Sequence, residues 1–261
     1  MALHDLSTMK ALTEKVTSIN PGAVIYGEPW TGGSTPLSAS QQASIANQSK
    51  FEGYGCFNDQ IRDALIAGGL AAKTDQAWAT YDTAGKSAAK WGGLQGGIKG
   101  QLSRSLDPDK AVTYASCHDN YTLYDRVKAA HGSSYSEETT LKMAELANAV
   151  VLTSQGTSFI LSGEEMLRSK GGNDNSYNAS YEVNALDYAN KVAHPTLFAD
   201  YVKLIALKQS LSGLHLGQDA SRALEINHSD DYSLVWYDLP EDYRRSEEHT
   251  SELQSHNDLV C

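Results

Sequence analysis

The chain has 261 residues, of which 41% are hydrophobic and 20% charged, as in an ordinary globular protein. Its net charge of -11 argues against nucleic-acid binding, which depends on clustered Lys and Arg. No apolar run approaches the ~18 residues that a membrane-spanning helix needs, so no membrane span is expected in this segment. The cysteines lack metal-ligand spacing, and Cys56 and Cys117 are expected to be buried thiols.

The first expected element is a helix over residues 5–19. Asp5 is its candidate N-cap, and the sequence Asn20-Pro21-Gly22 ends it. Its apolar residues recur at steps of three and four: Leu6, Met9, Leu12, Val16 and Ile19. A short buried strand is expected over 23–26, and it runs into the polar sequence Gly27-Glu28-Pro29-Trp30.

The same alternation of strand and helix recurs later in the chain. Strands are expected over 111–117, followed by His118-Asp119-Asn120, and over 157–161, followed by Ser162-Gly163-Glu164-Glu165. A helix is expected over 137–154, with Gly156 as its stop. A further helix over 195–210 is expected to bury Leu197, Phe198, Tyr201, Val202 and Ile205.

Glycines crowd the segment Trp91-Gly92-Gly93-Leu94-Gln95-Gly96-Gly97. They do not follow a strand, so we expect a flexible loop that does not bind phosphate. The long segments 31–51 and 69–110 are expected to be βα-loops around a functional site. Loops of this size exceed ordinary connection lengths and are commonly functional.

Apolar strands that each end in polar residues predict an α/β fold with a parallel sheet and a site at the strand C-termini, as in a (β/α)8 barrel. Residues 1–212 are assigned to a partial barrel of this kind. Beyond Gly213 short strand-like runs such as 232–237 predict the start of an all-β domain, a β-sandwich, over 213–244.

Residues 245–261 differ in character from the rest. Their sequence RSEEHTSELQSHNDLVC back-translates into a string that resembles a common sequencing-library adapter. A natural acidic surface helix is the alternative interpretation. The segment is treated as a non-native tail and left out of the fold prediction.

Five motifs in order along residues 1–244 resemble type I pullulanases of the α-amylase superfamily. They are Tyr26-Gly27-Glu28-Pro29-Trp30, Phe57-Asn58-Asp59-Gln60-Ile61-Arg62-Asp63, Ala115-Ser116-Cys117-His118-Asp119-Asn120, Ser162-Gly163-Glu164-Glu165-Met166 and Asn175-Ser176-Tyr177-Asn178. The resemblance implies a glycoside hydrolase that cleaves α-1,6 branch linkages in pullulan, amylopectin and limit dextrins with retention of configuration. Its partner would be an α-glucan.

The resemblance also implies roles for individual residues. Glu28 would be the general acid/base and Asp119 the carboxylate that stabilises the oxocarbenium-like transition state. His118 would hydrogen-bond sugar hydroxyls, and Trp30 would offer its apolar face to a glucose ring. Asn175 and Tyr177 would line the cleft.

Each role has a structural alternative. Glu28 could cap a helix or lie on the surface, His118 and Asp119 could form a turn ion pair, and Trp30 could belong to the core. Asn175 and Tyr177 could form a plain turn, which Asn and Gly favour without any ligand. Four further charged residues are expected to be structural: Arg62, Asp63, Glu164 and Glu165.

Retaining glycosidases need a nucleophilic carboxylate as well as an acid/base. In the family this Asp lies in the motif F-R-F-D-L-M-G-L-H-D, whose last five letters align with Met1-Ala2-Leu3-His4-Asp5. The nucleophile would therefore fall two residues before Met1. The chain is accordingly expected to be a truncated fragment that is inactive by itself.

Two alternatives to a pullulanase function remain open. The chain could come from another superfamily enzyme, such as an isoamylase or branching enzyme, or from a non-catalytic α-glucan-binding protein. No metal site and no cofactor are expected from the sequence, since no segment matches a calcium-binding loop. Calcium is common in the superfamily and is possible in the whole enzyme.

Overall fold

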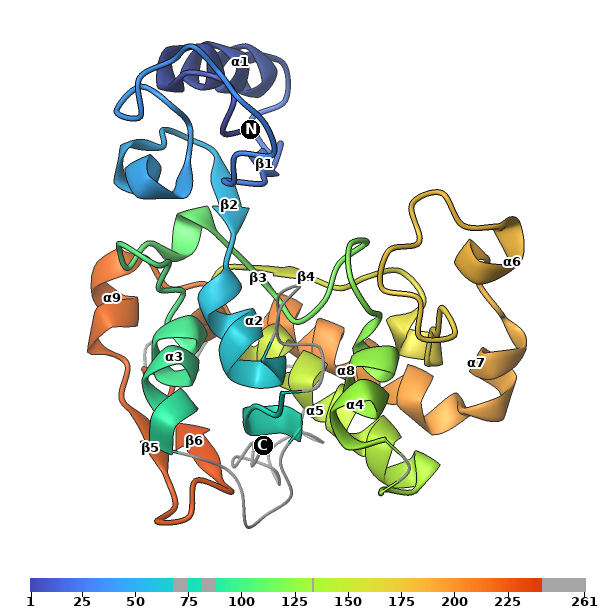
Figure 1. The fold of residues 1–261 in the computed structure, drawn as a ribbon. Helices are drawn as coiled ribbons and strands as arrows, with labels where there is room; N and C mark the ends of the chain where they lie inside the picture. The colour runs from blue at the N-terminus through green and yellow to red at the C-terminus, as the bar shows by residue number, and fades with distance from the viewer. Residues whose placement is uncertain (68–74, 81–87, 133, 241–261) are drawn as a thin grey trace.

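The computed structural model describes residues 1–67, 75–80, 88–132 and 134–240 (Figure 1). Its main sheet is formed by β1 (Tyr26–Gly27), β2 (Gly55–Phe57), β3 (Ala111–Tyr114) and β4 (Thr157–Phe159). The strands lie in the order β1-β2-β3-β4, and all three pairings are parallel. This parallel sheet with interspersed helices confirms the predicted α/β fold.

The helices connect successive strands or follow the last one. Helix α1 precedes β1, α2 and α3 lie between β2 and β3, and α4 and α5 lie between β3 and β4. Their bounds are Leu6–Ile19 for α1, Asp59–Ile66 for α2, Ala88–Ile98 for α3, Leu123–His131 for α4 and Glu137–Thr153 for α5. After β4 come α6 (Tyr181–Asn184), α7 (Ala189–Ala193), α8 (Pro195–Ser210) and α9 (Gln218–Ala223), then the antiparallel pair β5 (Ile226–His228) and β6 (Val235–Tyr237).

Helix α1 confirms the first predicted helix, including its cap. The Asp5 carboxylate accepts a hydrogen bond from the Thr8 amide at 2.8 Å. The predicted buried face is wrong in part, because Leu12 and Ile19 are exposed while Met9 and Thr13 are buried. Figure 1 shows α1 beside β1, apart from the other helices, and its buried Met9 belongs to a small core cluster with Phe51 and Tyr54.

Strand β1 is shorter and less buried than predicted. Of residues 23–27 only Tyr26 and Gly27 form the strand, although the Ile25 carbonyl accepts a hydrogen bond from the Gly55 amide at 2.8 Å. Val24 is 65% exposed. Within the described chain β1 forms the edge of the sheet and has one partner, β2. Residues 23–25 therefore lack the second neighbour that would bury them.

Helices α5 and α8 confirm the predicted elements to within a residue. The Ser136 hydroxyl caps α5 by accepting a hydrogen bond from the Thr139 amide at 3.1 Å. Helix α8 packs against α5 through Leu197 and Tyr201. The expected burial of Val202 and Ile205 is wrong, since they are 53% and 41% exposed. Ile205 lines an open pocket beside Leu152 and Ile160.

The glycine-rich segment is helical, so the predicted loop is wrong. Residues 91–97 lie inside α3, which packs closely against α2. A methyl group on Gly93 would lie 3.3 Å from the Ala64 Cβ. The glycines act here as small packing residues on a helix face, which outweighs their low helix propensity.

The largest hydrophobic core joins α2, α3 and α5 to the second sheet. Leu94, Val150, Ile226 and Val235 belong to this one cluster. The Trp78 indole donates a hydrogen bond to the carbonyl of Tyr232 at 2.8 Å across it. The β5–β6 pair therefore shares a core with the helices, and the assignment of residues 213–244 to a β-sandwich stays a prediction.

Some sequence predictions fall outside the described residues. The adapter-like tail, 245–261, and parts of the predicted loop 69–110 belong to the segments that the structure does not describe. The described part of that loop contains α3. Among the described helices none is both long and apolar enough to cross a membrane.

Candidate functional site

Glu28 lies at the C-terminal end of the edge strand. It follows β1 directly, and its side chain is exposed. The next residue, Pro29, is buried, and its carbonyl accepts a hydrogen bond from the Ile45 amide at 2.9 Å. A fixed backbone on both sides of Glu28 holds the carboxylate at the sheet edge while leaving it open to solvent.

His118 and Asp119 lie beyond the C-terminal end of β3, in a turn. The residue after them, Asn120, has a φ of 65°, a left-handed conformation that asparagine tolerates better than most residues. The His118 Nε2 and Asp119 Oδ2 atoms are 3.6 Å apart, and both side chains are largely exposed. An exposed pair at this distance stabilises the turn little, which leaves both groups available to a ligand.

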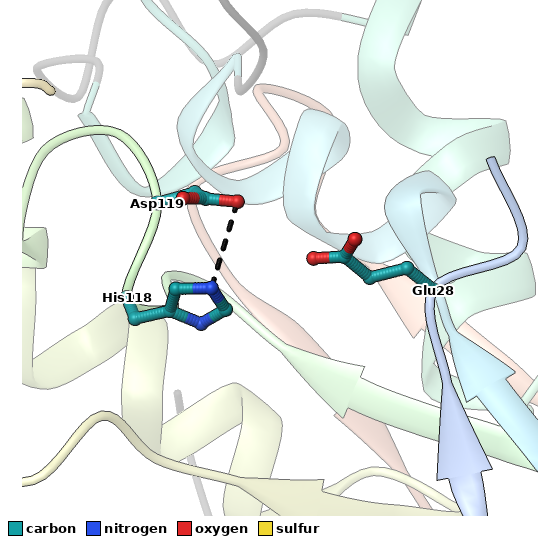
Figure 2. Close-up of side chains that lie close together, drawn as sticks. All are labelled: Glu28, His118 and Asp119. Atoms are coloured by element: carbon teal, nitrogen blue, oxygen red, sulfur yellow. Dashed lines mark ion pairs between the residues drawn. The ribbon is translucent and has the colours of Figure 1, made fainter. Parts of the chain in front are cut away.

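The structure brings these residues together across the sheet. One ligand atom each of Glu28, His118 and Asp119 lies within 4.8 Å of the others, although 90 residues separate the two segments. Figure 2 shows the Glu28 carboxylate pointing toward the turn that carries the other two. The parallel strands β1 and β3 end at the same edge, which is why the polar residues that follow them meet.

These three side chains are also the one group in the described residues that could hold a metal ion. Calcium takes six to eight oxygen ligands, and this group offers two carboxylates and an imidazole nitrogen. The group therefore does not fit a calcium site. Exposed carboxylates beside an imidazole suit hydrogen bonding to a polyhydroxyl ligand and proton transfer.

The remaining predicted site residues are exposed. Trp30, two residues after Glu28, is 38% exposed and is therefore not a core tryptophan. Tyr177 is 82% exposed, and the Asn175 amide donates to the Asn173 side chain at 2.9 Å in a local turn. No described contact joins Asn175 or Tyr177 to Glu28, His118 or Asp119, and their binding roles stay predictions.

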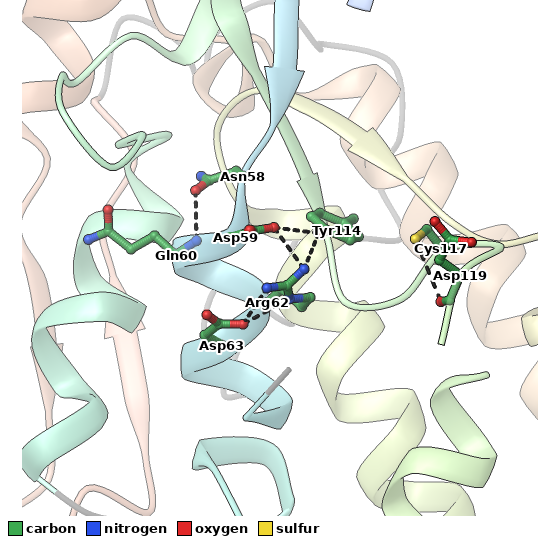
Figure 3. A network of polar contacts seen from close by, with 8 residues as sticks. All are labelled: Asn58, Asp59, Gln60, Arg62, Asp63, Tyr114, Cys117 and Asp119. Atoms are coloured by element: carbon green, nitrogen blue, oxygen red, sulfur yellow. Dashed lines mark hydrogen bonds and ion pairs between the residues drawn. The ribbon is translucent and has the colours of Figure 1, made fainter. Parts of the chain in front are cut away.

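A partly buried polar network of Asp59, Arg62, Asp63 and Tyr114 lies near Asp119 (Figure 3). The Tyr114 hydroxyl donates to Asp59 at 2.6 Å and accepts from Arg62 at 2.7 Å. Arg62 also pairs with Asp59 and Asp63, each at 2.8 Å. Burial raises the pKa of Tyr114, so its hydroxyl stays protonated and keeps its role as donor.

This network lies beside Asp119. A cavity of about 30 Å³ between α2 and the segment that joins β3 to α4 is lined by residues that include Arg62, Tyr114, Cys117, Asp119 and Asp174. Such a volume holds a single water molecule. Arg62 and Asp63 are thus held in structural contacts, as the sequence predicted, while Cys117 is partly buried rather than fully so.

Known proteins resemble this chain over most of its length. Pullulanase of Bacillus subtilis strain 168 is 30% identical over 248 residues, covering 92% of this chain and 34% of that protein. The crystal structure of pullulanase from Anoxybacillus sp. LM18-11, complexed with maltotetraose, matches with a TM-score of 0.83 at 31% identity and covers 92% of this chain and 34% of that one. Pullulanase from Bacillus acidopullulyticus matches at 37% identity with a TM-score of 0.80, over 94% of this chain and 29% of that one.

The chain belongs to the pullulanase family. No family model matches it. It spans about a third of the length of these relatives. The pullulanase resemblance predicted from the five motifs is thereby confirmed.

Within this pullulanase-family chain, sequence reasoning missed three residues near the site. Tyr114 and Asp174 line the cavity beside Asp119, and Lys170 contacts the backbone of His118. Tyr114 lies in a strand whose four residues are all buried, so no alternation marks which side chain faces the site. Lys170 is 52 residues from His118 in the sequence, so no local sequence pattern predicts that contact.

Proposed function

We propose that this chain is part of a glycoside hydrolase that cleaves α-1,6-glucosidic branch linkages in pullulan, amylopectin and limit dextrins with retention of configuration. The observation that carries the proposal is the meeting of Glu28, His118 and Asp119 at one edge of the sheet. The substrate class is supported by the relatives, one of which was solved with maltotetraose bound. No nucleic acid or cofactor has a part in this function.

Glu28 is proposed to protonate the leaving glycosidic oxygen and later to deprotonate the attacking water. Its carboxylate is exposed and lies at the end of a strand, where a bound glucan could reach it. General acid/base help of this kind is worth about 10²–10⁴-fold in rate. It requires one positioned carboxyl group, which Glu28 supplies.

Asp119 and His118 are proposed to act on the same sugar ring. The positive charge that develops in an oxocarbenium-like transition state is stabilised by a carboxylate that is already in place, and Asp119 is that group. The imidazole of His118, 3.6 Å from it, can hydrogen-bond a sugar hydroxyl. Trp30, exposed beside Glu28, is proposed to stack on a neighbouring glucose, with Asn175 and Tyr177 further along the cleft.

The architecture proposed for the whole enzyme is a (β/α)8 barrel. Residues 1–212 would form its C-terminal half, and residues 213–244 would begin a β-sandwich domain. The uniform parallel pairing of β1 to β4 in chain order supports this proposal. So do the polar residues gathered at the C-terminal strand ends, where barrel enzymes place their sites.

The 261-residue chain alone is proposed to be inactive toward pullulan. A retaining mechanism needs a nucleophile besides Glu28, and the family motif aligns that Asp ahead of Met1. A reducing-end assay with pullulan measures this. Turnover well above that of a Glu28→Gln control would contradict the assignment of the nucleophile.

Binding can be tested without turnover. Calorimetric titration of the 261-residue chain with maltotriose should detect binding. Asp119→Ala should weaken this affinity about tenfold, as expected for loss of a hydrogen bond to a charged group. Asp219→Ala is the matched control, because Asp219 is exposed and pairs with Arg222 on α9. Equal affinity in the two variants would contradict a glucan site at Asp119, and binding without any turnover in a longer chain would favour a non-catalytic glucan-binding protein.

A further inference from the structure

Lys170 is a buried lysine beside the candidate site. Lys170 is 5% exposed, and its Nζ atom donates a hydrogen bond to the backbone carbonyl of His118 at 2.9 Å. Burying an ammonium group is costly unless it is hydrogen-bonded. A bond to the carbonyl of His118 fixes the peptide that joins His118 to Asp119.

The backbone of Lys170 is itself held in place. Its amide donates to Asp125 Oδ2 at 2.7 Å, and the Ser169 hydroxyl donates to Asp125 Oδ1 at 2.5 Å. Asp125 is buried in the first turn of α4. One buried carboxylate therefore anchors the segment from which the lysine side chain reaches out.

A second buried carboxylate holds the two ends of the His118–Asp119 turn. Glu164 accepts hydrogen bonds from the Ser116 hydroxyl and from the Leu123 amide, the latter at 3.1 Å. Its other oxygen accepts from Asn148 at 2.9 Å. The segment after β4 thus contacts the turn after β3 at three places. Glu164 hydrogen-bonds both ends of the turn, and Lys170 hydrogen-bonds its middle.

The middle of that turn has few other supports. The His118 and Asp119 side chains are largely exposed, and the 3.6 Å pair between them is weak. The Cys117 thiol contacts the Asp119 carbonyl at 3.8 Å, a weak donor at a long distance. The bond from Lys170 is the charge-assisted one, and such bonds are about twice as strong as neutral ones.

We propose that Lys170 is a positioning residue that fixes the backbone of His118 and thereby orients the His118 and Asp119 side chains for glucan binding. The positioning step stands on the geometry alone, and its effect on glucan binding rests on the proposed function. Lys170 contacts the turn through the backbone of His118 and is not proposed to touch the sugar.

The test compares two buried lysines in the 261-residue chain. Lys208 is 7% exposed and donates to the backbone carbonyls of Ser154 and Leu214, the latter at 2.8 Å, but belongs to α8 and contacts neither His118 nor Asp119. Lys170→Met and Lys208→Met each remove a buried ammonium of the same kind. For both variants we would measure the NMR chemical shifts of the backbone amides of residues 118–120 and the affinity for maltotriose.

We expect Lys170→Met to shift the 118–120 amide signals and to weaken maltotriose binding about tenfold, the effect of losing a charge-assisted hydrogen bond. Lys208→Met should leave both unchanged even where it lowers thermal stability as much. Lys170→Arg, which keeps a charged donor, should restore most of the affinity. Signals at 118–120 that move no more in Lys170→Met than in Lys208→Met would overturn the proposal.

A measurement on the unsubstituted chain serves if Lys170→Met does not fold. Scalar coupling through the hydrogen bond, between the Lys170 Nζ and the His118 carbonyl carbon, should be detectable in labelled protein. An ammonium group that instead exchanges rapidly with water and shows no coupling would contradict the positioning role. If the unsubstituted chain does not bind maltotriose, the proposed function fails, while the amide signals and the coupling still decide the role of Lys170.

Discussion

A methyl group on Gly97 of α3 would lie 2.5 Å from the Cβ of Ile61 on α2. Real Cβ atoms do not approach so closely, so the two helices can pack at this distance only because Gly97 has no side chain. Ile61 is fully buried in the main core, and α2 begins shortly after β2 with Asp59, a member of the polar network near Asp119. The close packing therefore fixes a helix that carries Asp59 and Arg62.

Gly97→Ala should destabilise the chain by about 1–3 kcal/mol, the usual cost of overpacking a core. Gly92→Ala is the matched control in the same helix, because a methyl group there would meet nothing within 4 Å. That change should be neutral or stabilise by up to ~1 kcal/mol through helix propensity. Denaturant unfolding of both variants measures the difference, and equal stabilities would contradict the packing argument.

How much of this could be read from the sequence differs from element to element. Helices α1, α5 and α8 were predicted within a residue or two, because apolar spacing and capping residues are local signals. Helix α3 was missed, since its glycines serve a contact with α2 that only the fold creates. The exposure of Val202 and Ile205 was also missed, because an apolar face shows what a helix can bury and not how much its neighbours cover.

The candidate site was predicted from short motifs, and the structure brings Glu28, His118 and Asp119 together as parallel strand ends require. The supports behind them could not be predicted. Tyr114 meets Asp59 from 55 residues away, and Lys170 meets His118 from 52. Such contacts depend on tertiary structure, and their residue types carry no spacing that a single sequence reveals.

Tyr114→Phe should destabilise the chain by about 1–2 kcal/mol, because Asp59 and Arg62 each lose a buried hydrogen-bond partner while keeping each other. Tyr188→Phe serves as the control, since Tyr188 is an exposed tyrosine, and should change stability by less than ~0.5 kcal/mol. Thermal unfolding of the two variants decides the matter. A Tyr114→Phe variant as stable as the control would mean that the network contributes nothing to the fold.

Lys208 predicts a pH dependence of stability. Burial lowers the pKa of its ammonium group from the ordinary 10.5 to about 8. Below pH 8 the folded chain therefore carries the full cost of a buried charge, and between pH 8 and 10.5 the unfolded chain holds a proton that the folded chain has released. The contribution of Lys208 to stability accordingly rises with pH across this window.

The measurement is the difference in unfolding free energy between the unsubstituted chain and Lys208→Met. Between pH 7.5 and 10 the unfolding free energy of the unsubstituted chain should rise relative to that of Lys208→Met by on the order of 2 kcal/mol. Lys203→Met, which removes an exposed lysine paired with Asp200 at 2.8 Å, should show no such trend. A flat difference for Lys208→Met would contradict the lowered pKa.

Removal of residues 245–261 should leave the stability of the chain unchanged within ~0.5 kcal/mol, as for surface changes that remove no packing. The prediction follows from the adapter-like sequence, which selection for packing would not have shaped. Unfolding of the chain with and without the segment tests it. A loss of stability well above that value, or recovery of the same codons in genomic DNA, would contradict the adapter interpretation.

Glu28 is proposed to be the acid/base of an α-1,6-glucan hydrolase. The direct measurement is kcat on pullulan for Glu28→Gln in a chain that carries the family's nucleophile segment ahead of Met1. Glu52→Gln is the control, since Glu52 is exposed and pairs with Lys10 away from the site. We expect kcat to fall about 10²–10⁴-fold for Glu28→Gln with maltotriose binding retained, and to stay unchanged for Glu52→Gln. A Glu28→Gln enzyme with near-native kcat would contradict the acid/base role of Glu28.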